Sequence, residues 1–339
     1  MTSAKSLGAR STVGECSSSL QVQSDGLQVP RREADGKERG GSLSSMTVMV
    51  TGASGVVGRA TVKALLARDE VRATVRRAAD ASYLRQLGAK VAVRDIDSPD
   101  ALSEILPRCH TVVHLVGGVA QPDPDALFHA NHGSVLRALE AAKQAGTKRF
   151  VLLSVPGADP QATHPFLRAK GLAEEAVRAS GIQHAIVRST HAYGLGGLWF
   201  TAAVEGALAE PSFVVGRGDD DLAPVFVEDV ASVIAAIDDA PAELAGIWGL
   251  EGPDVVTGDG FARLLRADGA LPTHASGQAA AEVLTRILGV PIDAVTASFF
   301  ALPSRADAPD AAEAFGVART PLVEGLRVTL EAAAAIDTG

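Results

Sequence analysis

The amino-acid sequence predicts an α/β protein built on a doubly wound parallel sheet, with a small, mostly helical C-terminal cap. Apolar strand-like runs alternate with helical patterns from residue 46 to about residue 250, which is typical of a sheet covered by helices on both faces. A glycine-rich turn joins the first strand to the first helix. In addition, 47% of the 339 residues are hydrophobic, enough for the core that such a sheet needs.

The first strand, turn and helix form a candidate phosphate site. Val48-Met49-Val50 has the pattern of a buried strand, and glycines follow at positions 52, 55 and 58, before a helical pattern at 60–66. Gly52 allows a tight turn, Gly55 lets the backbone approach a pyrophosphate, and Gly58 lets the helix pack close to the strand. The helix N-terminus then points unpaired N–H groups at the anion. This context predicts nucleotide binding; the alternative is an ordinary strand–turn–helix connection.

Two arginines indicate which dinucleotide this site prefers. Residues 70–75 alternate as a second strand and end in Arg76-Arg77. An NAD-preferring site usually places Asp or Glu at this distance from the glycine loop. Guanidinium groups would instead pair with a ribose 2′-phosphate, and Arg59 is placed to help. The sequence therefore predicts NADP(H) in preference to NAD(H); the alternative is a solvated basic turn.

Strands and helices continue to alternate along the chain. The predicted helices span residues 82–87, 99–106, 125–145 and 165–179, and the predicted strands span 90–94, 111–116, 149–154 and 184–188. Gly117-Gly118 follows one of these strands, where it can lie against a nicotinamide or its ribose. Because parallel strands need helical crossovers, this alternation predicts the doubly wound topology.

The regular alternation of predicted strands and helices ends after Ser189. We expect a helix at 199–209, short strands at 213–215 and near 225, and a further helix that begins with Glu228-Asp229, where Asp229 serves as a cap. The last sheet strand is expected at 246–250, and residues 255–335 look mostly helical. The predicted organisation is a disordered, serine-rich extension at 1–45, a dinucleotide-binding domain at 46–250 with a cap insertion at about 190–224, and a C-terminal substrate cap at 251–335.

Composition excludes several classes of function. The formal net charge is −9 without a long Lys/Arg run, which argues against nucleic acid as a partner. Cys16 and Cys109 are too few for a disulfide scaffold or a cysteine zinc site, so no metal site is expected. No apolar run reaches the length of a membrane span. We therefore expect a soluble, cytoplasmic protein.

Taken together, these motifs resemble those of the short-chain dehydrogenase/reductase superfamily, most of all its extended and atypical branch with the NmrA-like proteins. The resemblance covers residues 47 to about 330 and rests on motifs in order: Thr51–Gly58, Asp95-Ile96, Val113-His114-Leu115, Asn131, Phe150–Ser154, Val187-Arg188-Ser189, Tyr193-Gly194 and Val227–Ala231. It implies a Rossmann-type sheet of about seven strands with a small C-terminal cap. It also implies cofactor contacts from the glycine loop, from a pair of adenine-contacting residues and from the end of strand four: Gly52, Ser54, Gly55, Val56, Val57, Gly58, Asp95, Ile96, Val116 and Gly117.

The family's chemistry uses a serine, a tyrosine and a lysine, the last two spaced Tyr-x-x-x-Lys. The lysine holds the nicotinamide ribose and lowers the pKa of the phenol, which gives the substrate carbonyl its proton. Ser154 matches the serine and Lys170 matches the lysine, but Phe166 stands at the tyrosine position. A phenyl ring has no proton to give. The resemblance therefore supports cofactor binding and does not support an ordinary ketoreductase.

Three other residues are candidates for the missing acid or for substrate contact. His164 precedes Phe166 by two residues and has an imidazole that titrates near neutral pH; the alternative is a surface histidine. His191 and Tyr193 follow the strand at 184–188, at the carboxyl edge of the sheet where ligands bind. Tyr193 carries a phenol, although the family pattern has a packing aromatic at that position.

Three functions remain open at this stage. The first is NADP(H)-dependent hydride transfer to a quinone-like or otherwise conjugated small molecule, because such an acceptor does not need the tyrosine. The second is a non-catalytic NADP(H) sensor or assembly subunit. The third is a redox-neutral epimerase or cyclase of secondary metabolism. Both a monomer and a homodimer are compatible with the sequence.

Overall fold

A computed structural model describes residues 46–337 except 97, 99–101, 242, 267, 269 and 303, so the predicted disorder of residues 1–45 lies outside the described part. Seven strands form one sheet in the order β11-β6-β5-β4-β1-β2-β3, and all neighbours are parallel. The strands are β1 (Thr47–Thr51), β2 (Glu70–Val75), β3 (Lys90–Val93), β4 (Cys109–His114), β5 (Arg149–Ser154), β6 (Gln183–Ser189) and β11 (Ala245–Leu250). The strand order reverses beside β1, which is where ligands bind in open sheets of this kind.

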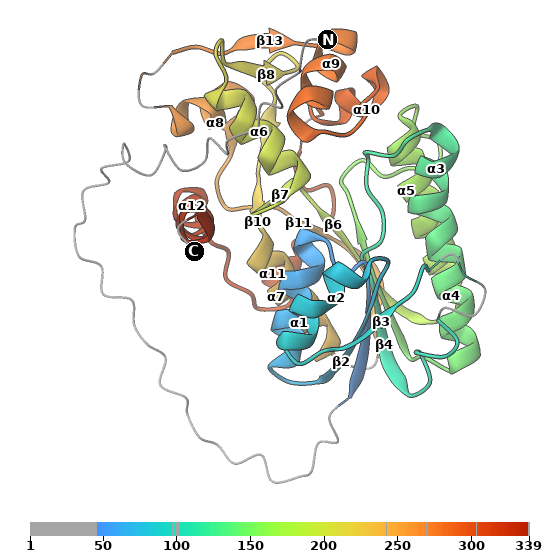
Figure 1. The fold of residues 1–339 in the computed structure, drawn as a ribbon. Coiled ribbons are helices and arrows are strands. Elements are labelled where there is room, and N and C mark those ends of the chain that lie inside the picture. Colours follow the sequence, from blue (N-terminus) through green and yellow to red (C-terminus); the bar gives the residue numbers. More distant parts are fainter. Residues whose placement is uncertain are drawn as a thin grey trace, which may run out of the picture.

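Helices cover both faces of the sheet (Figure 1). One face packs against α1 (Val56–Leu66), α2 (Ala78–Gln86), α7 (Val227–Asp238) and α11 (Ala311–Ala314). The other face packs against α4 (Ser134–Ala145) and α5 (Pro165–Arg178). Strand residues are therefore buried on both sides, which explains why β1 is apolar at successive positions instead of alternating. The predicted Rossmann-type doubly wound sheet is confirmed.

The cap lies over the carboxyl ends of the strands and is built from two parts of the chain (Figure 1). The first part contains α6 (Leu198–Leu208) and β8 (Phe213–Val215). The second contains α8 (Gly258–Leu265), β13 (Thr273–Ala275), α9 (Gly277–Leu288) and α10 (Ala294–Phe299). Strand β8 pairs with β13, so the two parts share one small sheet.

Shorter elements connect the sheet to the cap. Strand β7 (Ala192–Tyr193) pairs with β10 (Val225–Phe226), and β9 (Asp221–Leu222) pairs with β12 (Val256–Thr257). The remaining helices are α3 (Pro124–Phe128) and α12 (Leu322–Asp337). None of the described helices combines the length and the apolar character that crossing a membrane requires.

Three local predictions need correction. Residues 102–105 form turns instead of the second half of a helix, and the start of that predicted helix lies outside the described residues. The helix predicted at 125–145 contains a π-helical segment, η2 (His129–Gly133), between α3 and α4. Asp229 is not a helix cap, because its carboxylate accepts hydrogen bonds from the backbone N–H and hydroxyl of Thr320 at 2.7 and 2.8 Å. It attaches the segment before α12 to the start of α7.

Candidate functional site

A cleft of about 470 Å³ lies at the carboxyl edge of the sheet, beside the point where the strand order reverses. It runs from the β1–α1 turn past the ends of β2, β3 and β4 to η2. Eight of the residues expected to bind the cofactor line it: Gly52, Ser54, Gly55, Arg76, Asp95, Ile96, Val116 and Gly117. The structure therefore brings together residues that are up to 65 positions apart, from Gly52 to Gly117.

The three glycines of the turn have different physical roles. Gly52 has φ +72°, and an added Cβ would lie 2.7 Å from the carbonyl carbon of Leu115. Gly58 does not line the cleft; its added Cβ would lie 2.3 Å from the carbonyl oxygen of Gly52, so it permits the close approach of α1. Gly55 is exposed at the cleft, where a side chain would take up ligand space. The tight turn at Gly52 and the close packing at Gly58 are as the glycine spacing predicts, and the approach of a pyrophosphate to Gly55 stays a prediction.

The N-terminus of α1 is available to an anion. Gly55 is its N-cap residue, and no side chain caps this helix. Val56 and Val57 begin the helix, half-buried, with their side chains packed into the core clusters. Neither residue lines the cleft, so what they could offer an anion is the backbone N–H groups of the first turn, which carry the positive end of the helix dipole.

Arginines surround the far end of the cleft, and only one of the predicted pair lines it. Arg76 is exposed on the cleft wall. Arg77 instead makes a bidentate ion pair with Asp80, with nitrogen–oxygen distances of 2.9 and 3.0 Å. The pKa of Asp80 is lowered first by the hydrogen bond from Arg77 and then by the charges of Arg59 and Arg76. Three guanidinium groups therefore share this corner with one carboxylate.

The other end of the cleft is held by Asn131 on the π-helical segment. Its side-chain amide donates to the carbonyl of Gly118 and accepts from the N–H of Gly118, both at 2.9 Å. A Cβ added to Gly117 would lie 2.6 Å from Asn131 Oδ1 and 3.2 Å from Lys170 Nζ. Asn131 thus fixes the glycine pair after β4, and Lys170 lies directly beside it.

Ser154 ends β5 and Lys170 lies on α5, and neither residue lines the cleft. The Lys170 ammonium donates to the carbonyl of Leu153 at 3.1 Å and lies 5.9 Å from the centre of the Phe166 ring. Burial lowers the pKa of Lys170 to about 8. The Ser154 hydroxyl is buried and has no hydrogen-bond partner within the described residues. A ligand that enters this region would find one unpaired hydroxyl and one desolvated cation.

Two of the candidates for the proton donor, His164 and Tyr193, are engaged elsewhere. His164 is the N-cap of α5: its Nδ1 accepts from the N–H of Phe166, and its Nε2 lies 3.2 Å from the carbonyl of Val295 in α10. Tyr193 is fully buried, and its hydroxyl donates to the carbonyl of Leu322 at the start of α12. Burial raises the pKa of this phenol, and the nearby carboxylates add to the effect. Neither side chain lines the cleft.

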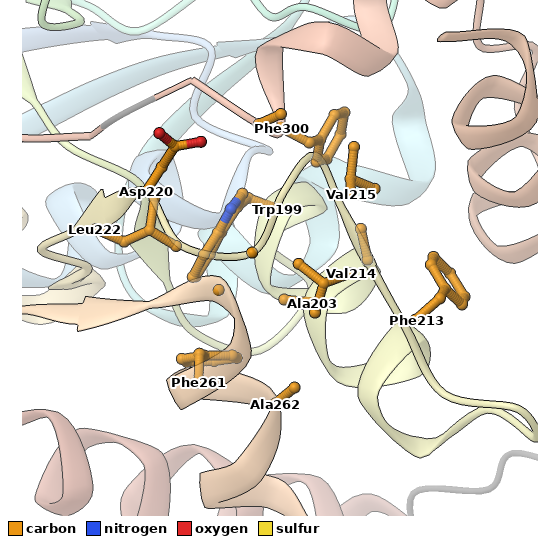
Figure 2. A pocket seen from close by; sticks show the side chains of 14 residues that line it. Trp199, Ala203, Phe213, Val214, Val215, Asp220, Leu222, Phe261, Ala262 and Phe300 are labelled. Carbon is orange, nitrogen blue, oxygen red and sulfur yellow. The ribbon is translucent and has the colours of Figure 1, made fainter. Parts of the chain in front are cut away.

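A second pocket of about 450 Å³ lies between the ends of β5 and β6 and the cap. We call it the aromatic pocket; it is bounded by Val155, Leu167, His191, Trp199, Phe299 and Leu302, with Arg305 and Asp307 also in its wall. A smaller apolar cavity of about 60 Å³ lies within the cap between α6, β8 and α8 (Figure 2). Trp199 lines both, so its side chain borders the two spaces.

Several lining residues were not identified from the sequence. In the cleft these include Thr74, Arg94, Gln121, His129 and Ser134. Thr74 and Arg94 stand at the ends of strands two and three, so the strand prediction could have located them. His129 and Ser134 reach the cleft because the π-helical segment changes the face that this helix presents, and the sequence carries no plain signal for that change.

Comparison with known proteins gives one family match. The NAD(P)H-binding family matches residues 52–241. Ceramide reductase of Caulobacter vibrioides is 30% identical over 191 residues, covering 56% of this chain and 60% of that protein. NADH dehydrogenase [ubiquinone] 1 alpha subcomplex subunit 9 of Arabidopsis thaliana is 27% identical over 267 residues, covering 74% and 63%. A photosystem II assembly factor of Cyanophora paradoxa is 26% identical over 145 residues, covering 42% and 44%. The chain thus spans less than two thirds of the length of each of these relatives.

Solved structures of low sequence identity share the fold. UDP-glucose 4-epimerase of Thermotoga maritima superposes with a TM-score of 0.64 at 18% identity, covering 86% of this chain and 99% of that one. UDP-glucuronic acid 4-epimerase of Bacillus cereus, in complex with UDP-glucuronic acid and NAD, gives 0.65 at 16% identity, covering 84% and 98%. At these identities the similarity concerns the arrangement of the sheet, its helices and the cap.

Proposed function

This chain belongs to the NAD(P)H-binding family, and from that premise we propose that it is an NADP(H)-dependent reductase that acts on a conjugated or quinone-like acceptor without a catalytic tyrosine. The observation that carries the proposal is the combination of the cleft beside the glycine turn with Phe166 at the position where the family has its proton donor. The cofactor, when bound, supplies hydride.

The residues of the cleft fit a dinucleotide. Gly52 and Gly55 leave room for a pyrophosphate beside the uncapped start of α1, whose N–H groups would bind its oxygens. Asp95 and Ile96 line the part of the cleft next to β3, where we place the adenosine. Ser154 does not line the cleft, but its buried hydroxyl has no hydrogen-bond partner among the described residues, which supports a polar ligand group reaching the end of β5.

We assign the preference for NADP(H) to Arg76. Its guanidinium lines the cleft, whereas that of Arg77 is paired with Asp80. Arg77 would support the site indirectly, because it neutralises a carboxylate that would otherwise repel a 2′-phosphate. Arg59 adds a third positive charge near Asp80.

The chemistry at the acceptor follows from what these side chains offer. Lys170 would hold the nicotinamide ribose and stabilise negative charge that develops on the acceptor, since its ammonium is buried and has no hydrogen-bonded carboxylate among the described residues. The Ser154 hydroxyl would donate a hydrogen bond to the acceptor oxygen. A conjugated acceptor spreads the negative charge over its π-system and takes its proton from water, so Phe166 does not block the reaction.

The test is an assay of NADPH oxidation by the purified protein with a panel of quinones and conjugated enones. The loss of NADPH absorbance measures the rate. Calorimetry with NADPH is run on the same preparation. We expect turnover with at least one quinone and none with simple ketones. Bound NADPH without turnover on any acceptor would refute the reductase assignment, and absence of NADPH binding would refute the whole proposal.

A second candidate is a non-catalytic NADP(H)-binding protein. The missing phenol at Phe166 favours it, as do two of the relatives, a photosystem II assembly factor and a subunit of NADH dehydrogenase. On this alternative, affinity capture with the full chain would retain a stable protein partner, and the amount retained would change with the NADPH/NADP⁺ ratio. Capture that ignores this ratio would exclude a sensor function.

A further inference from the structure

His191 stands out in the wall of the aromatic pocket because one nitrogen of its buried imidazole has no polar partner among the described residues. The residue is 7% exposed, and its Nε2 has no hydrogen-bond partner within the described residues. The other polar side chains beside it are engaged: Thr190 donates to the carbonyl of Ala223, and Ser304 accepts from the backbone N–H of His191. Buried imidazole nitrogens are normally paired, so this one points to a group that the pocket receives.

Aromatic side chains from the cap hold the imidazole in place. The Trp199 ring stacks on it, with centroids 4.9 Å apart and an interplanar angle of 10°. The Phe299 ring meets it edge-on at 5.3 Å. Phe299 also contacts Phe166 at 4.9 Å, so the imidazole and the vacant proton-donor position flank the same ring. This places His191 one ring away from the residue that replaces the catalytic tyrosine.

We propose that the aromatic pocket receives a flat aromatic carbonyl compound and that His191 determines its orientation by a hydrogen bond from Nε2–H to the carbonyl oxygen. The inference rests on the proposed function, whose acceptor it identifies more closely. The volume of about 450 Å³ suits a compound of two or three rings, and the pocket wall is mostly apolar. Burial lowers the pKa of His191 to about 3, so the ring is neutral and serves as a hydrogen-bond donor, not as a cation.

The assignment follows from the chemistry of the wall. Flat conjugated rings can lie against Trp199 and Phe299, whereas a sugar would leave the hydroxyls that face Val155, Leu167 and Leu302 without partners. One carbonyl oxygen would pair with the one buried imidazole nitrogen. His191 is thus a specificity-determining residue, while Ser154 and Lys170 keep their proposed contacts with the acceptor oxygen and the nicotinamide ribose.

The experiment uses tryptophan fluorescence, because the chain has two tryptophans and only one of them lines the pocket. A Trp248→Phe background leaves Trp199 as the reporter; Trp248 lies on β11 against Phe315. The probes are menadione and methylnaphthalene, which share a fused ring system but differ in the carbonyl groups. Both are titrated with and without NADP⁺ into the parent protein, into His191→Phe, which keeps a stacking ring, and into His191→Gln, which keeps a polar donor.

We expect menadione to quench Trp199 and His191→Phe to weaken menadione binding about three- to tenfold, the effect of one neutral hydrogen bond. Methylnaphthalene affinity should change less than twofold, and His191→Gln should recover part of the menadione affinity. Equal losses for the two probes, or none for menadione, would overturn the assignment. If His191→Phe proves too unstable to purify, nitrogen NMR of the histidine-labelled protein decides: the His191 ring signal should shift with menadione and not with methylnaphthalene.

Calorimetry with NADPH on each variant separates this inference from the function on which it rests. Unchanged NADPH binding in His191→Phe, together with unchanged menadione affinity, would refute the role of His191 and leave the reductase proposal intact. Absence of NADPH binding in the parent protein would refute the reductase proposal itself. A matched control, His110→Gln at the start of β4, alters a histidine away from the pocket and should change neither affinity.

Discussion

Replacing Gly117 with alanine tests the link between the loop after β4 and the cofactor cleft. Gly117 has φ +142°, and its added Cβ would lie 2.6 Å from Asn131 Oδ1, too close for any real contact. Asn131 would have to move and would give up hydrogen bonds to Gly118 of 2.9 Å. Asn131 is fully buried, so water would not replace these bonds.

The expected cost has two parts. Leaving buried polar groups unpaired costs about 1–3 kcal/mol. A side chain in this left-handed backbone region adds about 1 kcal/mol of strain. We therefore expect Gly117→Ala to lower the free energy of unfolding by about 2–4 kcal/mol. It should also weaken NADPH binding at least tenfold, because the loop lines the cleft.

The matched control is Gly146→Ala. Gly146 ends α4 with φ +70°, but nothing lies within 4 Å of its added Cβ, so only the strain of about 1 kcal/mol applies. Urea unfolding followed by tryptophan fluorescence gives both free energies, and calorimetry gives both NADPH affinities. Equal destabilisation by the two substitutions would show that the Asn131 contact contributes nothing and would refute the reasoning.

The other predictions concern the cofactor and the reacting end of the site. Arg76→Ala should weaken NADPH binding about tenfold, because one charge-assisted hydrogen bond at an exposed site is lost, and should weaken NADH binding less than twofold. Calorimetry measures both affinities. The control Arg327→Ala makes the same charge change on α12 and should alter neither affinity. Phe166→Tyr should introduce reduction of simple ketones, which the parent protein is expected to lack, because a phenol then lies beside Lys170; no ketone reduction by the variant would mean that the site has lost the family geometry. The pKa of Lys170 falls from 10.5 to about 8 on folding, so between these pH values the unfolded chain binds more protons and stability rises with pH. In urea unfolding at a series of pH values, Lys170→Met should remove this increase in the free energy of unfolding, which amounts to up to about 3 kcal/mol. If the increase persists in the variant, another group causes it. Trp199→Ala should join the aromatic pocket to the cap cavity, and kcat/KM for acceptors with a bulky substituent should then increase relative to unsubstituted ones.

Local sequence was enough to predict the sheet and one end of the cleft. Strands at 149–154 and 213–215 have the predicted bounds, and the glycine turn has the predicted conformation, with positive φ at Gly52 and tight packing at Gly58. These features depend on residues a few positions apart: alternation of apolar side chains, the need for glycine in a left-handed conformation, and the start of a helix. The π-helical turn around Asn131 was not predictable in this way, because a helix with one extra residue keeps almost the same apolar period.

Whether a candidate side chain lies in the cleft or pairs elsewhere depended on partners far away in the chain. His164 bonds to a carbonyl 131 positions later, and Tyr193 to one 129 positions later, so both are engaged with the cap and α12 instead of the cleft. Arg76 and Arg77 are identical in type and adjacent, yet one lines the cleft and the other pairs with Asp80.

By itself, the sequence determined that this protein has a Rossmann-type sheet with a glycine turn before the first helix, because backbone conformation and apolar periodicity are local properties. Only the tertiary structure decided which polar groups are left for a ligand. Burial and hydrogen-bond pairing arise when separate segments pack together, as when α6 and α10 enclose His191 and its Nε2 finds no partner in the part of the chain that the structure describes.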